Sequence, residues 1–135
     1  MRAIAILLLV GGLAAAASAD DAAQGRALYE GQCAPCHFSA ELPLETGAAM
    51  AAIPVMMATY GPRLSGIIGR AAGTDPAFLY SRSFGEASAG LVWSAAALDR
   101  FLIDSRAMLP GIRMFYRQPD AEVRRRILAY LATTG

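Results

Sequence analysis

Apolar residues recur at helical spacing in the second half of the chain. Phe101 and Leu102 follow Leu98 by three and four positions, which places all three on one face of an α-helix. Ser94 lies before them and suits the N-cap, because its hydroxyl can accept a hydrogen bond from a backbone N–H of the first turn. The pattern predicts a helix over residues 94–104.

A second helical pattern lies near the C-terminus. Four residues form its apolar stripe: Val123, Ile127, Tyr130 and Leu131. Pro119 is expected in the first turn, where the missing backbone N–H costs no hydrogen bond. The run Arg124-Arg125-Arg126 is expected to form the solvated face of this helix.

A third helix is predicted over residues 21–32. Asp21 is followed three positions later by Gln24, which is similar to a capping box at a helix start. No segment alternates apolar and polar residues as a half-buried strand does. Glycines and prolines between the helical segments indicate loops. The fold class is therefore all-α, with long loops.

The most apolar segment is the N-terminal one. Arg2 precedes an apolar stretch, and the small residues Ala17-Ser18-Ala19 stand before Asp20, as at a signal-peptide cleavage site. We therefore expect a signal peptide at residues 1–19 and a single domain at 20–135. The alternative is an uncleaved membrane anchor, which is disfavoured because the apolar run is short and interrupted by glycines.

Size and charge limit the function further. The chain has 135 residues, enough for one compact domain. Its 12 basic residues, all arginine, against 11 acidic residues give a net charge of +1. A nucleic-acid partner is not expected, because binding phosphates requires a concentrated excess of positive charge.

The two cysteines belong to one short motif, Cys33-Ala34-Pro35-Cys36-His37. A thioredoxin-like redox pair would need surrounding strands, which the sequence does not predict. A zinc site would need four protein ligands, or three with a water, whereas the chain has two cysteines and a single histidine, and the nearby Glu41 is a poor fourth ligand. Both alternatives leave part of the motif or of its surroundings unexplained.

Covalent attachment of haem accounts for every residue of the motif. The two thiols can add to the two vinyl groups of haem, and the next residue presents an imidazole to the iron. We therefore favour one haem c, attached through Cys33 and Cys36, with His37 as an iron ligand.

Other motifs follow in order along the chain. They are Gly25 and Tyr29 before the cysteines, then Gly61-Pro62-Arg63-Leu64-Ser65-Gly66, Gly69-Arg70-Ala71-Ala72-Gly73, Gly90-Leu91-Val92-Trp93, Pro110-Gly111-Ile112-Arg113-Met114 and Ile127-Leu128-Ala129-Tyr130-Leu131. In this order and spacing the chain resembles the class I cytochromes c, soluble electron carriers of mitochondria and the bacterial periplasm. The resemblance spans nearly all of residues 20–135 and implies the small cytochrome c fold, in which three main helices and loops surround one haem.

The resemblance also implies the sixth iron ligand. Met114 matches the ligand position that follows the Pro-Gly pair in the family, and Met108 is the next candidate. A methionine thioether is soft and neutral, so it favours ferrous iron and raises the reduction potential. The expected metal ligands are therefore His37 and Met114.

Further cofactor-binding roles come from the same resemblance. The carbonyl of Pro62 is expected to accept a hydrogen bond from the second ring nitrogen of His37. Arg70, Tyr80 and Trp93 match the partners of the haem propionates. For Tyr80 and Trp93, an ordinary place in the aromatic core is an equally good explanation. The residues expected to pack the first helix across the last one are Gly25, Tyr29, Ile127 and Tyr130.

The chain departs from the family pattern at several positions. Phe101 and Ile112 stand where the family often has hydroxyl-bearing residues, so the pocket is expected to be more apolar. The segment at residues 38–60 is longer than in small family members and contains several methionines. It is expected to form either an extra helix over one haem edge or an apolar surface that docks a partner.

The resulting expectation is a non-enzymatic protein that carries one electron at a time in the periplasm. Its partners would be periplasmic or membrane-bound redox proteins, with a membrane attachment of its own only if the leader is uncleaved. One alternative is a dedicated haem subunit of a periplasmic dehydrogenase. Another is a gas-binding or peroxidatic haem protein whose iron keeps an open site.

Overall fold

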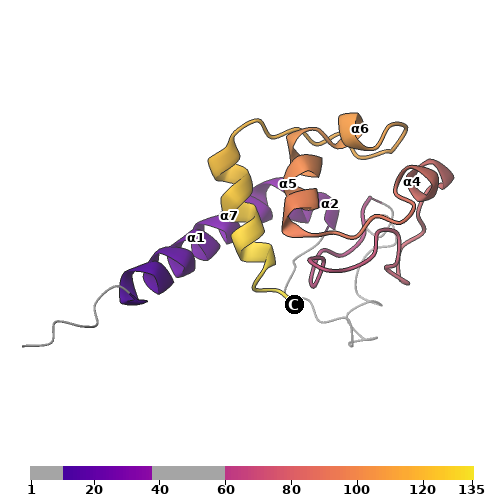
Figure 1. The fold of residues 1–135 in the computed structure, drawn as a ribbon. Helices are drawn as coiled ribbons and strands as arrows, with labels where there is room; N and C mark the ends of the chain where they lie inside the picture. Colours follow the sequence, from indigo (N-terminus) through magenta and orange to yellow (C-terminus); the bar gives the residue numbers. More distant parts are fainter. Residues whose placement is uncertain (1–10, 38–59) are drawn as a thin grey trace, which may run out of the picture.

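The computed structural model describes residues 11–37 and 60–135 (Figure 1). The helices in these ranges are α1 (Gly11–Gln32), α2 (Ala34–His37), α4 (Arg82–Ala87), α5 (Ala95–Ile103), α6 (Ser105–Met108) and α7 (Ala121–Leu131). Strand-like pairing in the described residues is limited to an isolated antiparallel bridge between Ala71 and Val92. The all-α prediction is confirmed.

Helix α5 begins where the sequence predicts. The Ser94 hydroxyl accepts a hydrogen bond from the backbone N–H of Ala97 at 3.1 Å. Leu98, Phe101 and Leu102 are buried, as their spacing indicates. The predicted helix over 94–104 therefore differs from α5 only at its end residues.

Helix α7 begins later than the sequence suggests. Its N-cap is Asp120, whose Oδ1 accepts hydrogen bonds from the backbone N–H groups of Glu122 (2.8 Å) and Val123 (3.3 Å). The placement of Pro119 in the first turn was wrong, because the Asp120 carboxylate caps the helix one residue further on. The Arg125 and Arg126 side chains both pair with Glu122, at 2.7 Å and 3.0 Å.

The predicted start of the first helix was also wrong. Helix α1 begins at Gly11 and not at Asp21, because half of the intervening residues are alanine, the best helix former. The capping box is absent, since the Gln24 side-chain amide donates to Asp20 at 2.6 Å and the Asp21 carboxylate pairs with Arg125. No helix in the described part of the chain is long and apolar enough to cross a membrane.

Helices α1 and α7 cross and pack tightly, as Figure 1 shows. The rings of Tyr29 and Tyr130 lie 5.3 Å apart at 57°, and Tyr29 and Ile127 are fully buried. At Gly25 the two backbones meet, because a Cβ there would lie 1.8 Å from the Arg126 carbonyl oxygen. The predicted packing of the first helix across the last is confirmed.

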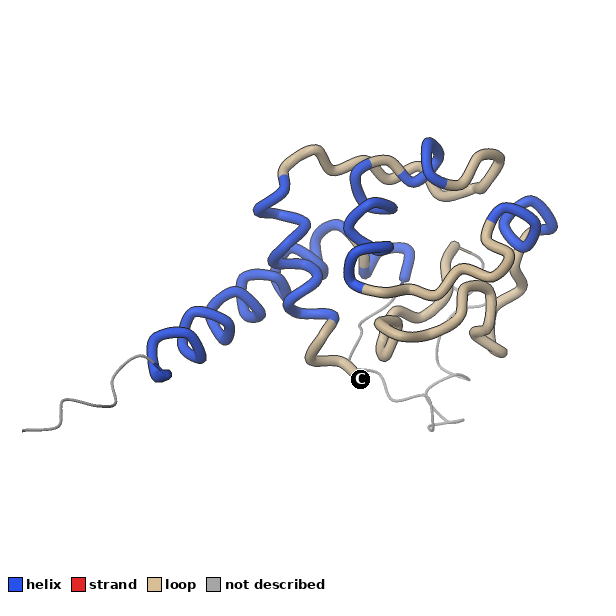
Figure 2. Tube along the Cα trace, in the orientation of Figure 1, coloured by secondary structure: helices blue, strands red, loops and turns tan. Residues whose placement is uncertain are grey.

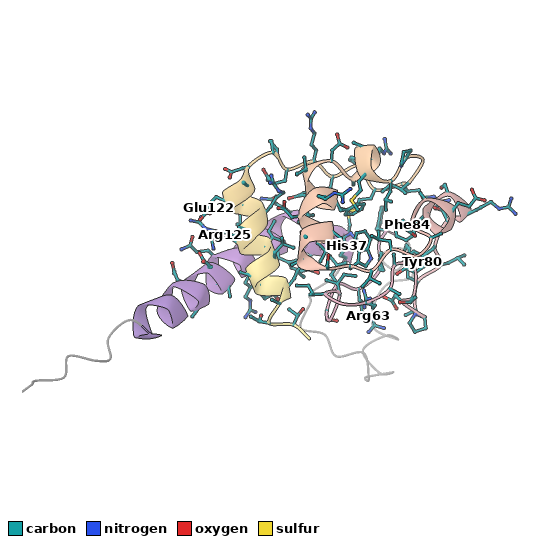
Figure 3. All side chains as sticks on the ribbon, viewed as in Figure 1. His37, Arg63, Tyr80, Phe84, Glu122 and Arg125 are labelled. Atoms are coloured by element: carbon teal, nitrogen blue, oxygen red, sulfur yellow. The ribbon has the colours of Figure 1, made fainter. Side chains whose placement is uncertain are left out.

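The expectation that all three consecutive arginines of α7 are solvated was wrong for Arg124. Its side chain is only 9% exposed, and its Nε donates to the Asp99 carboxylate on α5 at 2.8 Å. Its Nη1 donates to the carbonyls of Gln118 and Pro119, both at 2.9 Å. Arg124 thus joins α7 to α5 and to the loop before α7. Figure 3 shows Arg125 and Glu122 on the side of α7 that faces away from His37.

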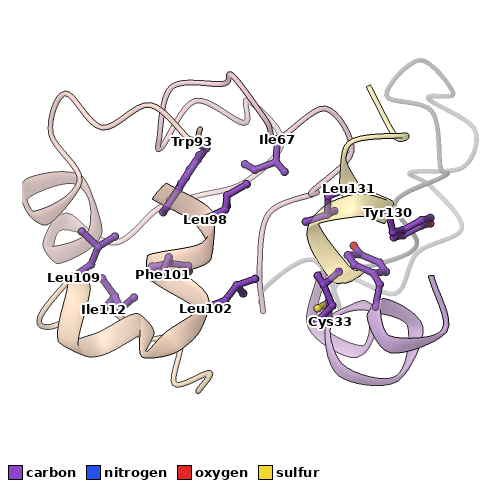
Figure 4. Close-up of a cluster of buried hydrophobic side chains, with 12 residues drawn as sticks. Cys33, Ile67, Trp93, Leu98, Phe101, Leu102, Leu109, Ile112, Tyr130 and Leu131 are labelled. Atoms are coloured by element: carbon purple, nitrogen blue, oxygen red, sulfur yellow. The ribbon is translucent and has the colours of Figure 1, made fainter. Parts of the chain in front are cut away.

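Loops make up most of residues 60–94, with α4 as the helix among them (Figure 2). Five glycines in the described loops and turns adopt positive φ: Gly66, Gly69, Gly73, Gly90 and Gly111. The buried side chains gather around α5 and its loops and around the α1–α7 crossing (Figure 4). Trp93, Phe101 and Ile112 lie in the first of these groups, and Cys33 lies with Leu131 in the second.

Candidate functional site

Cys33, Cys36 and His37 are held together in one tight turn. The backbone N–H groups of Cys36 and His37 both donate to the Cys33 carbonyl, at 3.0 Å and 2.9 Å. Helix α1 ends just before Cys33, and α2 ends at His37. Cys33 is buried and Cys36 is exposed. Neither thiol is consumed by a disulfide.

The His37 ring has a defined orientation. Its Nδ1 lies 2.7 Å from the carbonyl oxygen of Pro62. A carbonyl can only accept, so Nδ1 carries the proton and Nε2 keeps its lone pair. Burial lowers the pKa of His37, although the hydrogen bond to Pro62 opposes this shift. The ring is therefore neutral at pH 7, with Nε2 free to bind a metal.

Gly61 packs directly against this ring. A Cβ at Gly61 would lie 2.5 Å from Cε1 and 2.6 Å from Nδ1 of His37. The segment of Gly61 and Pro62 thus fixes the imidazole both by contact and by hydrogen bond. In the sequence Gly61 is visible only as part of a motif, and its position directly before Pro62 is the one local signal of this contact.

The donor set fits haem c better than the other two chemistries. It offers two unpaired thiols and a neutral imidazole whose Nε2 is available, which is what covalent haem with one histidine ligand requires. In the described ranges no group of three or more His, Cys, Asp and Glu side chains is arranged to hold a metal ion. The described residues contain no β-strand beside the cysteines, so the thioredoxin-like arrangement is not formed there.

Arg70 was predicted to bind a haem propionate, and its guanidinium binds backbone carbonyls in the structure. Nη2 donates to the Arg63 carbonyl at 2.6 Å, and Nη1 donates to the Ser65 carbonyl at 3.3 Å. These bonds fix the loop that follows Pro62. The propionate role of Arg70 remains a prediction.

Tyr80 and Trp93 both take part in aromatic clusters. The Tyr80 ring lies 4.9 Å from Phe78 and 5.1 Å from Phe84, and its hydroxyl is 3.4 Å from the Asp75 backbone N–H, which donates to it. Trp93 is 5% exposed, and its ring lies 5.0 Å from Phe101. Trp93 thus has an ordinary core role, whereas Tyr80 is half-buried and stacks on Phe84 at the edge of the core. The propionate role of both residues stays a prediction.

Asp75 is a buried residue that the sequence analysis missed. The residue is 4% exposed. Its carboxylate accepts hydrogen bonds from the backbone N–H groups of Arg63 (3.0 Å) and Ala77 (2.9 Å). It joins the loop carrying Pro62 to the segment carrying Tyr80. Only its place before Pro76 marked it as a turn residue, so the sequence held little sign of this role.

The two methionines considered as iron ligands, Met108 and Met114, are both partly buried against the core. The turn between them contains Gly111 at φ 81°, a conformation that glycine adopts without strain. Ile112 is 4% exposed and Phe101 is 7% exposed, so both departures from the family pattern are buried and apolar. Ligation by Met114 remains a prediction.

The insertion at residues 38–60 falls outside the described residues except for Tyr60. The Tyr60 side chain is exposed. The two expectations for this segment, an extra helix or a docking surface, therefore remain untested.

No protein-family model matches the chain, but individual proteins do. Cytochrome c2 of Rhodomicrobium vannielii is 31% identical over 137 aligned positions, which cover 98% of this chain and 97% of that protein. Cytochrome c2 of Rhodopseudomonas palustris is 31% identical over 129 positions, covering 84% of this chain and 98% of that protein.

Two solved structures are similar in fold. Ferricytochrome c2 from Rhodopseudomonas palustris matches with a TM-score of 0.65 and 30% identity, covering 85% of this chain and 99% of that chain. Cytochrome cH from Methylobacterium extorquens matches with a TM-score of 0.62 and 29% identity, covering 84% of this chain and 98% of that chain.

Proposed function

Because the chain belongs to the class I cytochromes c, we propose that it binds one haem c covalently and carries single electrons between redox partners. The observation that carries this proposal is the 2.7 Å contact between His37 Nδ1 and the Pro62 carbonyl. It leaves Nε2 as the ring nitrogen able to bind iron, in the residue that directly follows the two thiols.

Each residue of the site has a separate task. Cys33 and Cys36 would hold the haem through thioether bonds, and His37 would bind the iron through Nε2. Pro62 keeps the proton on Nδ1, and Gly61 leaves room for the ring at the required position. Met114 would supply a thioether as the second iron ligand from this chain. When bound, haem c supplies the reversible one-electron change at iron.

The test is the absorption spectrum of the haem-loaded protein with Met114→Ala and, as a matched control, Met108→Ala. A low-spin ferric spectrum with the weak far-red methionine band is expected for the unchanged protein and for Met108→Ala. Met114→Ala is expected to lose the band and to bind carbon monoxide when reduced, because one iron position is then open.

The opposite results are equally informative. Carbon monoxide binding by the unchanged protein would contradict the electron-carrier proposal and favour a gas-binding or peroxidatic haem protein. Loss of the far-red band in Met108→Ala alone would assign the ligand to Met108. Either result is read from the same spectra.

We also propose that residues 1–19 are a signal peptide and that residues 20–135 work in the periplasm. Helix α1 continues through the proposed cleavage site, but Asp21, Gly25 and Tyr29, which contact α7, all follow Ala19. Cleavage there therefore leaves these contacts in place. Intact mass measurement of the exported protein tests it: a mass that includes residues 1–19, with recovery in the membrane fraction, would indicate an anchor.

A further inference from the structure

Ser105, at the start of α6, is a fully buried polar residue outside the proposed haem ligands. Its backbone N–H donates to the Tyr116 carbonyl at 3.1 Å. Its hydroxyl donates to the Met114 carbonyl at 3.2 Å and accepts the backbone N–H of Tyr116 at 3.1 Å. All three hydrogen bonds go to Met114 and Tyr116. Ser105 therefore fixes the backbone on both sides of Phe115.

Arg106 adds a second hold on the same segment. Its Nε donates to the Met114 carbonyl and its Nη2 to the Arg113 carbonyl, both at 3.2 Å. Its guanidinium also lies over the ring of Phe115, 5.6 Å from the centroid. The Met114 carbonyl thus accepts from two neighbouring side chains, one buried and one exposed.

The short helix that presents these two side chains is itself well anchored. Asp104 caps α6 by accepting the backbone N–H of Ala107 at 3.0 Å, and α6 packs against α5. The backbone N–H of Gln118 donates to the Leu102 carbonyl of α5 at 2.9 Å. The segment carrying Met114 is therefore bonded to a rigid part of the fold on both sides.

We propose that Ser105 is a positioning residue that keeps Met114 in place as an iron ligand, with Arg106 as its support. This inference rests on the proposed function, in which Met114 is the sixth ligand. A methionine side chain is flexible and its thioether is a neutral ligand, so its hold on iron depends on how firmly its backbone is fixed. Loss of the Ser105 hydroxyl removes one donor from the Met114 carbonyl and leaves the Tyr116 N–H without that acceptor.

The test measures how easily an external ligand replaces Met114. Imidazole is titrated into the ferric, haem-loaded protein, and displacement is followed by loss of the far-red methionine band. Ser105→Ala is expected to bind imidazole about tenfold more tightly than the unchanged protein, from the loss of roughly one buried hydrogen bond's stabilisation. The potential of the haem should fall together with the band, because methionine ligation raises it.

The chain offers a matched control for burial and chemistry. Ser88 is 4% exposed, and its hydroxyl donates to the Phe84 carbonyl of its own turn at 2.7 Å. Ser88→Ala is expected to lower global stability without changing imidazole affinity. Arg106→Lys keeps the positive charge but loses the paired hydrogen bonds from the guanidinium to the Met114 and Arg113 carbonyls. It is expected to bind imidazole about threefold more tightly than the unchanged protein. Arg100→Lys is the control for Arg106→Lys, because Arg100 is an exposed arginine of α5.

The following results would overturn the inference. Equal imidazole affinities for Ser105→Ala and Ser88→Ala would overturn this inference while the far-red band of the unchanged protein upheld the proposed function. Absence of that band from the unchanged protein would overturn both. If Ser105→Ala does not fold, Arg106→Lys decides the matter, and an affinity equal to that of Arg100→Lys would overturn the inference.

Discussion

His37 is held by two consecutive residues of one loop. Pro62 accepts the hydrogen of Nδ1, and Gly61 lies so close to the ring that no side-chain atom fits between them. The ring is thus fixed by residues far from it in sequence, which fold back over α2. A ligand histidine held in this way loses little further freedom when it binds a metal.

Substitution of Gly61 by alanine tests this contact. Gly61→Ala places a Cβ within 2.6 Å of both Cε1 and Nδ1 of His37, so the ring or the loop must move. We expect destabilisation of about 1–3 kcal/mol and a larger high-spin fraction in the ferric spectrum. Gly85→Ala is the control, because a Cβ at Gly85 meets nothing within 4 Å. Equal spectra for the two variants would contradict the role of Gly61.

At the scale of helices, the crossing of α1 and α7 is the most extensive helix contact in the described part of the chain. It combines a close backbone approach at Gly25 with the buried rings of Tyr29 and Tyr130. Arg124 then connects α7 to α5 through Asp99. A buried arginine paired with one carboxylate and two carbonyls is well compensated, so removal of its partner leaves a costly unpaired charge.

Two glycines of α1, Gly25 and Gly31, allow the effect of close packing to be measured apart from the effect of helix propensity. Gly25→Ala is expected to destabilise the protein by about 2–3 kcal/mol, because its Cβ would overlap the Arg126 carbonyl. Gly31→Ala is expected to be neutral or stabilising by up to about 1 kcal/mol, since a Cβ there meets nothing within 4 Å. Urea denaturation of both variants checks the difference. If Gly25→Ala were as stable as Gly31→Ala, the crossing of α1 and α7 would tolerate a wider separation of the two helices.

Local patterns in the sequence predicted some of these elements and missed others for physical reasons. Helix α5 was predictable because Ser94 and its apolar face are local signals. The start of α1 was not, because an alanine-rich stretch continues a helix past any cap-like residue. Burial of Arg124 depends on Asp99, 25 residues away, and no local pattern shows such a pairing.

The candidate site shows the same division. Cys33, Cys36 and His37 were visible as a motif, because their chemistry requires adjacent positions. The role of Ser105 was not visible, since it arises only where the chain turns back and places Met114 and Tyr116 beside α6. Contacts made by chain reversal need the structure.

For the molecule as a whole, charge is nearly balanced and much of it is paired across distant segments. Arg125 on α7 bonds the carboxylates of Asp21 on α1 and Glu122 on its own helix. The hydrogen bonds from Arg125 hold the pKa values of both carboxyls below their ordinary values of 3.8 and 4.5. These exposed groups contribute modestly, and their effect depends on pH.

Acid should weaken this arrangement in a predictable direction. Because the folded-state pKa values of Asp21 and Glu122 are lowered, their contribution is present above the ordinary values and is lost as the pH falls through the lowered ones. Arg125→Gln is therefore expected to reduce stability at pH 7 and to reduce the loss of stability below about pH 5. Denaturation of Arg125→Gln between pH 7 and acid pH checks this expectation. Arg82→Gln, a substitution of an exposed arginine on α4, is the control. An unchanged acid slope in Arg125→Gln would contradict the assignment.

The crossing of α1 with α7 also sets an order of events during synthesis. Asp21 and Arg125 stand 104 positions apart, so the contact closes a loop of nearly the whole chain. The ring contact between Tyr29 and Tyr130 therefore forms only after the last helix has been made. Cys33, which is 8% exposed in the same buried cluster as Tyr130 and Leu131, remains reachable until that moment. The growing chain thus has an interval in which its cysteines can react before folding buries the first of them.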